Sequence, residues 1–378
     1  MIKDQAQINA LLADIRRFVR ERWHPIEDEV ERLDQVPEAL VLELRRKGYF
    51  GWSIPRIYGG LGLTTEELVL CAFELSQASV ALRARVGTNT GIGSEALVAD
   101  GTEEQKQRWL PRMATGELTG CLALTEPQAG SEATNVQTSA RTEGDVYVLN
   151  GSKTFITNGI NADLVIVAAK TDPTQRHAGM SLLVVERGME GFERGRNLDK
   201  IGLHAQDTAE LFFTDVRVPV ANLLGTEGHG FRHLVNNLPQ ERLGIAAAAV
   251  SHAAAALDWT LAYTKERTAF GQPIASFQNS RFKLAEMATE IEIGRTFVDA
   301  CVVELNDNTL TAEQAAMAKW WCTEMQKRTV DTCLQLHGGY GYMLEYPIAR
   351  AYLDARITTI YGGTTEIMKE VIGRSLGV

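Results

Sequence analysis

A glycine-rich corner near the end of the sequence places a carboxylate beside a sharp bend. The stretch Tyr361–Glu370 reads YGGTTEIMKE, and Glu366 is the first ionisable group after the two glycines. Paired glycines let a chain turn sharply or approach a ligand closely. If this corner faces a reacting ligand, an acid or a base must lie nearby, at Glu366 or on another element.

A second candidate segment combines a strand-like run with a polar turn. Cys121–Asn135 reads CLALTEPQAGSEATN, and its turn contains Pro127, Gly130 and Ser131. The backbone amides and the hydroxyls of Thr125 and Ser131 could hydrogen-bond a flat polar ligand. Taken alone, the segment is better interpreted as an ordinary strand and loop.

Two other segments also have plain structural interpretations. Gly151–Gly159, GSKTFITNG, would be a β-corner in most proteins. Lys265–Ile274, KERTAFGQPI, would be the charged last turn of a helix followed by a stop. The glycine patterns GLGLTT and GYGYML do not complete a dinucleotide-binding fingerprint after a strand, and no nucleophile elbow or P-loop occurs. A nicotinamide dehydrogenase of the Rossmann type is therefore disfavoured.

Composition narrows the class of protein. The formal net charge of −10 argues against nucleic acid or an anionic membrane as the main partner, although a local basic pocket stays possible. The five cysteines are dispersed without a C-x-x-C pair, which favours reduced thiols over a disulfide framework or a zinc site, and we expect no metal. The amphipathic start is unlike a secretory signal, and the longest apolar run is rich in alanine and too short to span a bilayer. These features predict a soluble, cytoplasmic protein.

The period of the apolar residues changes twice along the chain. Helical spacing predicts helices over Gln5–Trp23, Pro37–Lys47, Thr64–Arg83 and Glu103–Ala114. Short β-rich runs without intervening helices follow from about Cys121 to Gly225 and predict an antiparallel sheet or barrel. The last part predicts helices over Phe231–Glu266, Phe277–Asn306, Ala312–His337, Ile348–Ile357 and Thr365–Ser375. We therefore expect an α+β fold, mainly α, with a helical domain (1–117), a β domain (118–228) and a helical bundle (229–378).

The segments above, taken together, resemble the acyl-CoA dehydrogenase family over nearly the whole chain. The matching motifs are LTEPQAGSE, KTFITNG, KIGLHAQDTAELFFTDVRVP, NLLGTEGHGF, ERTAFGQPIASFQ, QLHGGYGYMLEYPIARAYLDAR and IYGGTTEIM, in the family's order. The resemblance implies an FAD enzyme with the same three-part fold, usually a tetramer built as a dimer of dimers.

The resemblance also assigns cofactor contacts. Around the flavin it implies Leu122, Leu124, Thr125, Gly130, Ser131, Phe155 and Thr157. At the pyrophosphate and adenine end, from the neighbouring subunit, it implies Arg267, Phe270, Gln278, Gln335 and Gly339. Thr364 and Glu366 would lie near the same cofactor. An arginine suits an anionic pyrophosphate because it donates several charge-assisted hydrogen bonds.

The reaction that the resemblance implies is α,β-dehydrogenation of an acyl thioester, in which a carboxylate removes the α-proton and flavin N5 receives the β-hydride. Many members carry the base directly after the tyrosine of the IYxG corner, where this chain has Gly362. Members similar to the long-chain and isovaleryl branches carry it where this chain has Glu241, and the long-chain type also has an IYGGT corner. Gly244, one turn further, is an unfavourable residue inside a helix unless a ligand passes there. We therefore interpret Glu241 as the base, with Glu366 as its rival.

The remaining substrate contacts and partners follow from the same resemblance. Ser131, Arg242, Gly244, Tyr361 and Gly362 would contact an acyl-CoA, although Arg242 would serve equally as a surface charge. The product would be a trans-2-enoyl-CoA, and an electron-transferring flavoprotein would accept the electrons. Two alternatives remain: a dehydrogenase of a carrier-protein-bound or unusual thioester, and an inactive flavin-binding subunit that has lost its base.

Overall fold

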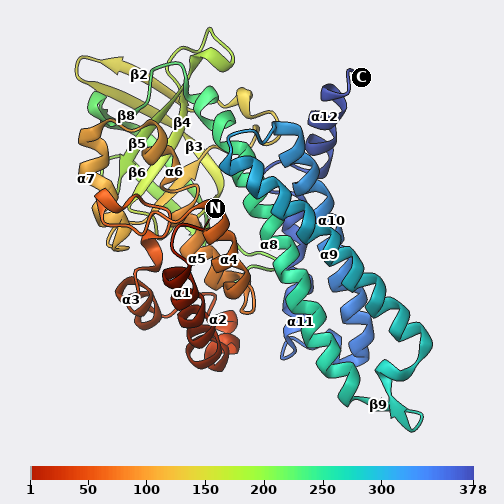
Figure 1. Ribbon diagram of the computed structural model, residues 1–378. Coiled ribbons are helices and arrows are strands. Elements are labelled where there is room, and N and C mark those ends of the chain that lie inside the picture. Colours follow the sequence, from red (N-terminus) through yellow and green to blue (C-terminus); the bar gives the residue numbers. More distant parts are fainter. Residues whose placement is uncertain (1) are drawn as a thin grey trace.

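The computed structural model describes residues 2–378 and has three parts (Figure 1). Helices of the N-terminal part lie beneath a β-sheet, and a long helical bundle runs along both (Figure 1). The predicted fold class, α+β and mainly α, is confirmed.

The N-terminal part contains more and shorter helices than the sequence predicts. They are α1 (Gln5–Phe18), α2 (Glu27–Leu33), α3 (Glu38–Arg46), α4 (Thr65–Leu75), α5 (Val80–Thr90), α6 (Glu95–Asp100) and α7 (Glu103–Ala114). The single helix predicted over Thr64–Arg83 is wrong, because the chain breaks between α4 and α5. At the break the Ser76 hydroxyl donates to the Ala72 carbonyl at 2.7 Å, and the Glu27 carboxylate accepts the Ser79 amide. This break gives α5 its own direction.

The middle part is an eight-stranded sheet with the order β6-β7-β3-β2-β4-β5-β8, and β1 also pairs with β4. The strands are β1 (Gly120–Ala123), β2 (Ser139–Glu143), β3 (Val146–Thr157), β4 (Leu164–Lys170), β5 (Met180–Glu186), β6 (Phe192–Asn197), β7 (Thr208–Pro219) and β8 (Leu223–Leu224). Most pairs are antiparallel as predicted. However, β1 pairs with β4 in parallel, because the β2–β3 hairpin intervenes in the sequence and returns the chain to the same direction.

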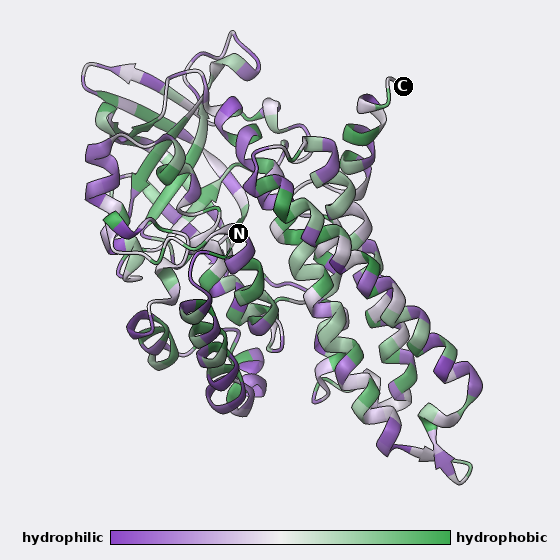
Figure 2. Ribbon diagram, in the orientation of Figure 1, coloured by the Kyte–Doolittle hydropathy of each residue, from purple (hydrophilic) through white to green (hydrophobic). Residues whose placement is uncertain are grey.

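The C-terminal part is the predicted bundle. Its helices are α8 (Gly230–Glu266), α9 (Gln278–Asn306), α10 (Ala312–His337), α11 (Pro347–Ala355) and α12 (Thr365–Ser375), and the short strands β9 (Thr268–Ala269) and β10 (Gln272–Pro273) form its tip. Helix α8 is long and apolar enough to cross a membrane by length and composition, but 67% of its most apolar window is buried inside the protein. Its small alanine side chains let α9 and α10 approach closely, and Figure 2 shows apolar positions gathered inside the bundle and the sheet.

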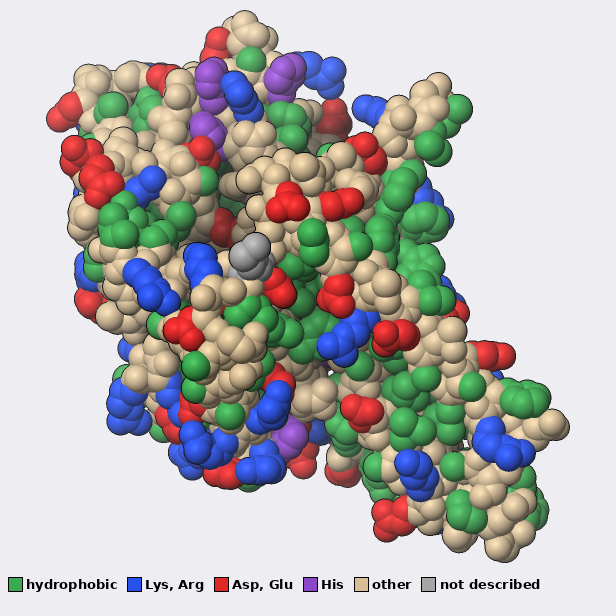
Figure 3. Space-filling view, viewed as in Figure 1, with side chains coloured by type: hydrophobic (Ala, Val, Ile, Leu, Met, Phe, Trp, Pro, Cys, Tyr) green, Lys and Arg blue, Asp and Glu red, His purple; other side chains and the backbone are tan. Residues whose placement is uncertain are grey.

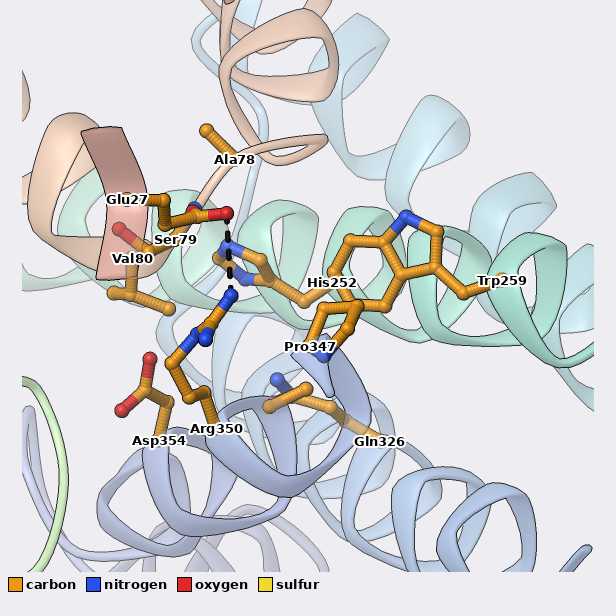
Figure 4. Close-up of a pocket in the computed structure, with 11 residues that line it drawn as sticks. Glu27, Ala78, Ser79, Val80, His252, Trp259, Gln326, Pro347, Arg350 and Asp354 are labelled. Carbon is orange, nitrogen blue, oxygen red and sulfur yellow. Dashed lines mark hydrogen bonds and ion pairs between the residues drawn. The ribbon is translucent and has the colours of Figure 1, made fainter. Parts of the chain in front are cut away.

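A polar junction fixes the N-terminal helices to the bundle (Figure 4). Arg350 of α11 donates to Asp28 at 2.7 Å and to Glu27 at 3.4 Å. His252 and Asp354 lie at the same small cavity, whose 20 Å³ suffices for about one water molecule. The Asp354 carboxylate also accepts the Leu203 amide at 2.6 Å, so this junction joins all three parts.

Candidate active site

Glu241 lies in the early turns of α8, directly after Gln240, which lines a cavity. The cavity lies between α4, α5 and α8 and has a volume of about 140 Å³. From α8, Gln240, Gly244 and Ala247 line it at the three- and four-residue spacing of one helix face. A Cβ at Gly244 would meet no atom within 4 Å, so this glycine borders open space. Its position agrees with the expectation that a ligand passes along α8 here.

The corner Tyr361–Glu370 packs against the same turns of α8. A Cβ built on Gly362 would lie only 2.4 Å from Cδ1 of Ile245, one turn after Glu241. Gly362 also has a φ of 64°, a backbone conformation that side chains rarely adopt. A glutamate at position 362 would therefore require both backbone strain and displacement of Ile245. The contact gives a physical reason why glycine at 362 accompanies a carboxylate at 241.

Two buried cations hold the corner in place. Arg242 Nε donates to the Gly362 carbonyl at 3.5 Å, and Lys319 Nζ donates to the Gly363 carbonyl at 2.6 Å. Burial lowers the pKa of Arg242, and burial together with the Arg242 charge lowers the pKa of Lys319 to about 8. The predicted substrate contact of Arg242 is thus accompanied by a structural contact with the bend.

The environment of Glu241 suits a base. The residue is half-buried, and burial of its carboxylate followed by the nearby Glu95 charge raises its pKa to about 8. Glu95, at the start of α6, also lines the cavity and accepts a hydrogen bond from Gln240 at 2.8 Å. Burial raises the pKa of Glu95 to about 7. A carboxylate whose pKa lies near neutral pH can both accept and release a proton efficiently under those conditions.

Glu366, the rival base, lies in a different environment. It is exposed in the first turn of α12, after Thr364, whose hydroxyl accepts the Ile367 amide and begins the helix. Hydrogen bonds from its own backbone amide and from Thr364 lower the pKa of Glu366. A solvated carboxylate with a lowered pKa is a weaker base than Glu241.

The predicted flavin segments come together in the sheet. The Thr154 amide donates to the Thr125 carbonyl at 2.9 Å, which joins the loop after β1 to β3. Beneath this contact, Lys153 and Glu126 form a fully buried ion pair at 2.7 Å, and Lys153 also donates to the Leu124 carbonyl at 3.1 Å. Although burial opposes it, the Lys153 charge and two backbone donors hold the pKa of Glu126 below its usual range. The pair therefore stays ionised and fixes both segments.

The resulting surface fits the flat ring of a flavin. Leu122, Leu124, Thr125 and Thr157 are half-buried, whereas Gly130 and Ser131 are exposed. Phe155 is 68% exposed and has a φ of 58°, so the backbone is strained while it presents an aromatic ring to solvent. An exposed aromatic ring beside half-buried leucines and hydroxyls fits an aromatic cofactor, which would cover the apolar atoms.

The predicted pyrophosphate contacts lie elsewhere in the protomer. Arg267 directly follows α8, 26 residues after Glu241, or roughly 40 Å along the helix at 1.5 Å per residue. Arg267, Gln335 and Gly339 line one surface groove, and the Arg267 guanidinium lies 5.5 Å from the centre of the Tyr340 ring. Phe270 is 97% exposed nearby, and Gln278 begins α9. One chain therefore does not bring these residues to its own flavin surface, as expected if they serve a neighbouring subunit.

Several residues that shape this site were not identified from the sequence. Arg83 and Glu95 line the cavity, and Glu126 with Lys153 orders the flavin loop. Glu126 and Lys153 lie inside the motifs LTEPQAGSE and KTFITNG. The opposite charges in two consecutive motifs could have indicated an ion pair between them. Arg83 and Glu95 fall on either side of a glycine-rich helix end and had no such signal. Within residues 2–378, no three His, Cys, Asp or Glu side chains form a group able to hold a metal ion.

Comparison with known proteins agrees with this geometry. The chain matches family models of the acyl-CoA dehydrogenase N-terminal domain over residues 5–117, middle domain over 121–216 and C-terminal domain over 228–377. It is 44% identical to the mitochondrial long-chain specific acyl-CoA dehydrogenase of Sus scrofa, over 96% of this chain and 84% of that protein.

Solved structures show the same relationship. An acyl-CoA dehydrogenase from Geobacillus kaustophilus has a TM-score of 0.96 and 46% identity, with both chains fully covered. An acyl-CoA dehydrogenase of Bacillus anthracis in complex with FAD has a TM-score of 0.92 and 32% identity, over 99% of this chain and 68% of that one. The chain therefore belongs to the acyl-CoA dehydrogenase family, FAD-dependent oxidoreductases that act on acyl-CoA.

Proposed function

We propose that the protein oxidises a saturated acyl-CoA to the trans-2-enoyl-CoA with Glu241 as the base. The observation that carries the proposal is a half-buried carboxylate of raised pKa one turn before Ile245, the side chain that a Cβ at Gly362 would displace. Glu241 takes the α-proton, and the Gly362 N–H donates to the thioester oxygen, where negative charge develops. A bound FAD supplies the acceptor for the β-hydride. Ser131 and Tyr361 complete the substrate contacts.

The pH dependence of the reaction tests the role of Glu241. The ionised base is needed, so kcat/KM should rise with pH to a plateau above about 8 and fall roughly tenfold per unit below that value. Because the Glu95 charge raises the pKa of Glu241, the variant Glu95→Gln should shift the midpoint to lower pH. Initial rates from pH 6 to 10 would measure both profiles, and a kcat/KM that stays constant across this range in the parent protein would contradict the assignment.

A neighbouring copy would complete the cofactor site, and we propose a tetramer built as a dimer of dimers. Support comes from the separation of Arg267 from the flavin surface and from exposed apolar side chains on α9, including Phe282, Ile293 and Val303. Figure 3 shows hydrophobic side chains along the bundle.

The cofactor contact of Arg267 can be tested by substitution. The variant Arg267→Ala should lose charge-assisted hydrogen bonds to the pyrophosphate, each worth about 1.5–3 kcal/mol, and so bind FAD at least tenfold more weakly. FAD per chain after gel filtration would measure the loss, with Lys265→Ala in the last turn of α8 as the control. Full retention of FAD by Arg267→Ala would argue against this placement.

Other members of the family suggest alternative reactions and substrates, and one titration distinguishes them. Relatives include an acryloyl-CoA reductase (NADH) and a prolyl acyl carrier protein oxidase, so direction and thioester carrier both vary. Anaerobic titration with acyl-CoAs of graded length and branching should bleach the flavin if the proposal holds. Absence of bleaching with any CoA ester would favour a carrier-bound thioester or an inactive subunit.

We further propose a cytoplasmic location and an electron-transferring flavoprotein as the electron acceptor. The acceptor is supported by the relationship to a subunit of a caffeyl-CoA reductase–Etf complex.

A further inference from the structure

Lys319 is a fully buried lysine of α10 that reaches the glycine corner. It has 0% of its surface exposed, and its Nζ donates to the Gly363 carbonyl at 2.6 Å. Within residues 2–378 it forms no ion pair, and the carboxylates that act on it from a distance are those of Glu324 and Glu366. A buried ammonium group is unfavourable unless hydrogen bonds or an opposite charge compensate it. The single bond to the corner uses only one of its three donors.

Neither of the two carboxylates neutralises Lys319 directly. Glu324 accepts a hydrogen bond from the Thr365 hydroxyl at 2.9 Å and pairs with Lys327 at 2.8 Å. Glu366 is exposed, so solvent screens its charge. Burial lowers the pKa of Lys319 to about 8, and the ammonium form therefore still predominates at neutral pH.

Arg242 brings a second cation to the same corner from α8. Its Nε donates to the Gly362 carbonyl at 3.5 Å, and a Cβ built on Gly363 would lie 3.7 Å from its Nη2. After burial, the Arg242 charge is the next cause of the lowered pKa of Lys319, so the two cations repel each other. Glu241 favours the charged form of Arg242, but its own pKa of about 8 leaves it mainly protonated at neutral pH. The corner therefore carries an excess of buried positive charge.

Negative charge develops beside this corner in the proposed reaction. The α C–H bond breaks, the proton passes to Glu241, and the electron pair moves toward the thioester oxygen, which accepts the Gly362 N–H. Because the Cα atoms of successive residues are about 3.8 Å apart, Lys319 Nζ would lie within roughly 10 Å of that oxygen. At this separation and an effective dielectric constant of about 20, the attraction between unit charges corresponds to roughly tenfold in a rate.

We propose that Lys319 is a positioning residue for the dehydrogenation, and that its buried charge stabilises the negative charge on the thioester oxygen through the corner that it holds. The inference rests on the proposed function, because it assumes that the Gly362 N–H donates to that oxygen. Lys319 itself exchanges no proton and contacts no substrate atom. A lysine that only held the bend could be replaced by a neutral donor, so the charge distinguishes the two roles.

Three substitutions separate the charge of Lys319 from its hydrogen bond. Lys319→Met removes both, Lys319→Gln keeps a neutral donor, and Lys319→Arg keeps a cation. We expect kcat to fall on the order of tenfold in Lys319→Met and Lys319→Gln, with KM changed by less than about twofold, because the interaction strengthens only as charge develops. Lys319→Arg should retain most of the rate. A parental kcat in Lys319→Gln would overturn the proposal, even if Lys319→Met failed to fold.

The matched control is Lys327→Met, two turns further along α10. The Lys327 side chain is 41% exposed and pairs with Glu324 at the surface. Its removal should leave kcat within about twofold of the parent value, since exposed ion pairs contribute little. Equal losses of kcat in Lys327→Met and Lys319→Gln would indicate a general disturbance of α10 and would contradict the specific role of Lys319.

A ligand that cannot reduce the flavin tests the electrostatic role without turnover. 3-Oxobutanoyl-CoA has no hydrogen on its β-carbon, and its acidic α-proton lets it bind as an enolate that carries negative charge on the thioester oxygen. Against FAD, this enolate should give a long-wavelength charge-transfer absorbance. In FAD-loaded Glu241→Gln, adding Lys319→Gln should raise the midpoint pH for the appearance of this absorbance by about one unit, which corresponds to tenfold. An unchanged midpoint would overturn the proposal.

The two measurements also distinguish this inference from the proposed function. If Glu241→Gln still reduces its flavin with a saturated acyl-CoA while Lys319→Gln shifts the midpoint, only the assignment of the base fails. If Glu241→Gln abolishes reduction while Lys319→Gln changes neither kcat nor the midpoint, only the role of Lys319 fails.

Discussion

Replacing Glu241 by glutamine is expected to stop reduction of the flavin by acyl-CoA, with a fall in rate of roughly 10²–10⁴-fold or more. Glutamine keeps the size and the hydrogen-bonding capacity of the side chain but cannot accept the α-proton. Its neutral amide also tolerates the buried position that raises the pKa of Glu241 to about 8. The variant should therefore fold and bind FAD. Stopped-flow recording of flavin absorbance under anaerobic conditions would measure the loss.

The matched control is Glu366→Gln, which removes the exposed carboxylate of α12. Because this residue is solvated and its pKa is lowered, reduction should proceed at a rate within a few-fold of the parent protein. Rapid bleaching in Glu241→Gln together with loss of bleaching in Glu366→Gln would reverse the assignment of the base.

Replacing Lys153 by methionine is expected to destabilise the protein by about 3–5 kcal/mol, because it leaves Glu126 buried without its partner. Neither side chain has more than 1% of its surface exposed. The same change should loosen the loop that carries Leu124 and Thr125, so FAD should also bind more weakly. Thermal unfolding followed by circular dichroism and the FAD content would measure the two effects.

The double variant Glu126→Met with Lys153→Met distinguishes charge from packing. With both charges removed, the uncompensated carboxylate disappears, and most of the lost stability should return. The loop amides of Gln137 and Thr138 would still lack the acceptor that Glu126 provides, so recovery should be incomplete. A double variant less stable than Lys153→Met would contradict this account.

The sequence predicted the elements whose apolar period is long and regular. Ala312–His337 and Thr365–Ser375 are confirmed at both ends, and Phe231–Glu266 is one residue short of α8. The helix predicted over Thr64–Arg83 failed because the Ser76 hydroxyl bonds to the Ala72 carbonyl and the distant Glu27 carboxylate accepts the Ser79 amide, and periodicity reveals neither contact. The short strands β2 and β6 were missed because their residues are largely polar or exposed.

Only the site residues that lie within the family motifs could be predicted from the sequence. Glu241 and Gly362 were paired through the family resemblance, and their proximity depends on Ile245, a contact between residues more than a hundred positions apart. Arg83 and Glu95 join the site through the packing of α4, α5 and α8, which no local pattern specifies. Local patterns thus located the segments, whereas the tertiary packing determined which charges share one cavity.

The contact between Gly362 and Ile245 constrains how such enzymes diverge. A carboxylate added at the corner would have to displace the Ile245 side chain on the facing turn of α8, so relocation of the base involves both places. A base at position 362 and a base at position 241 are therefore alternative arrangements of one pocket, and this chain has the residues of the second.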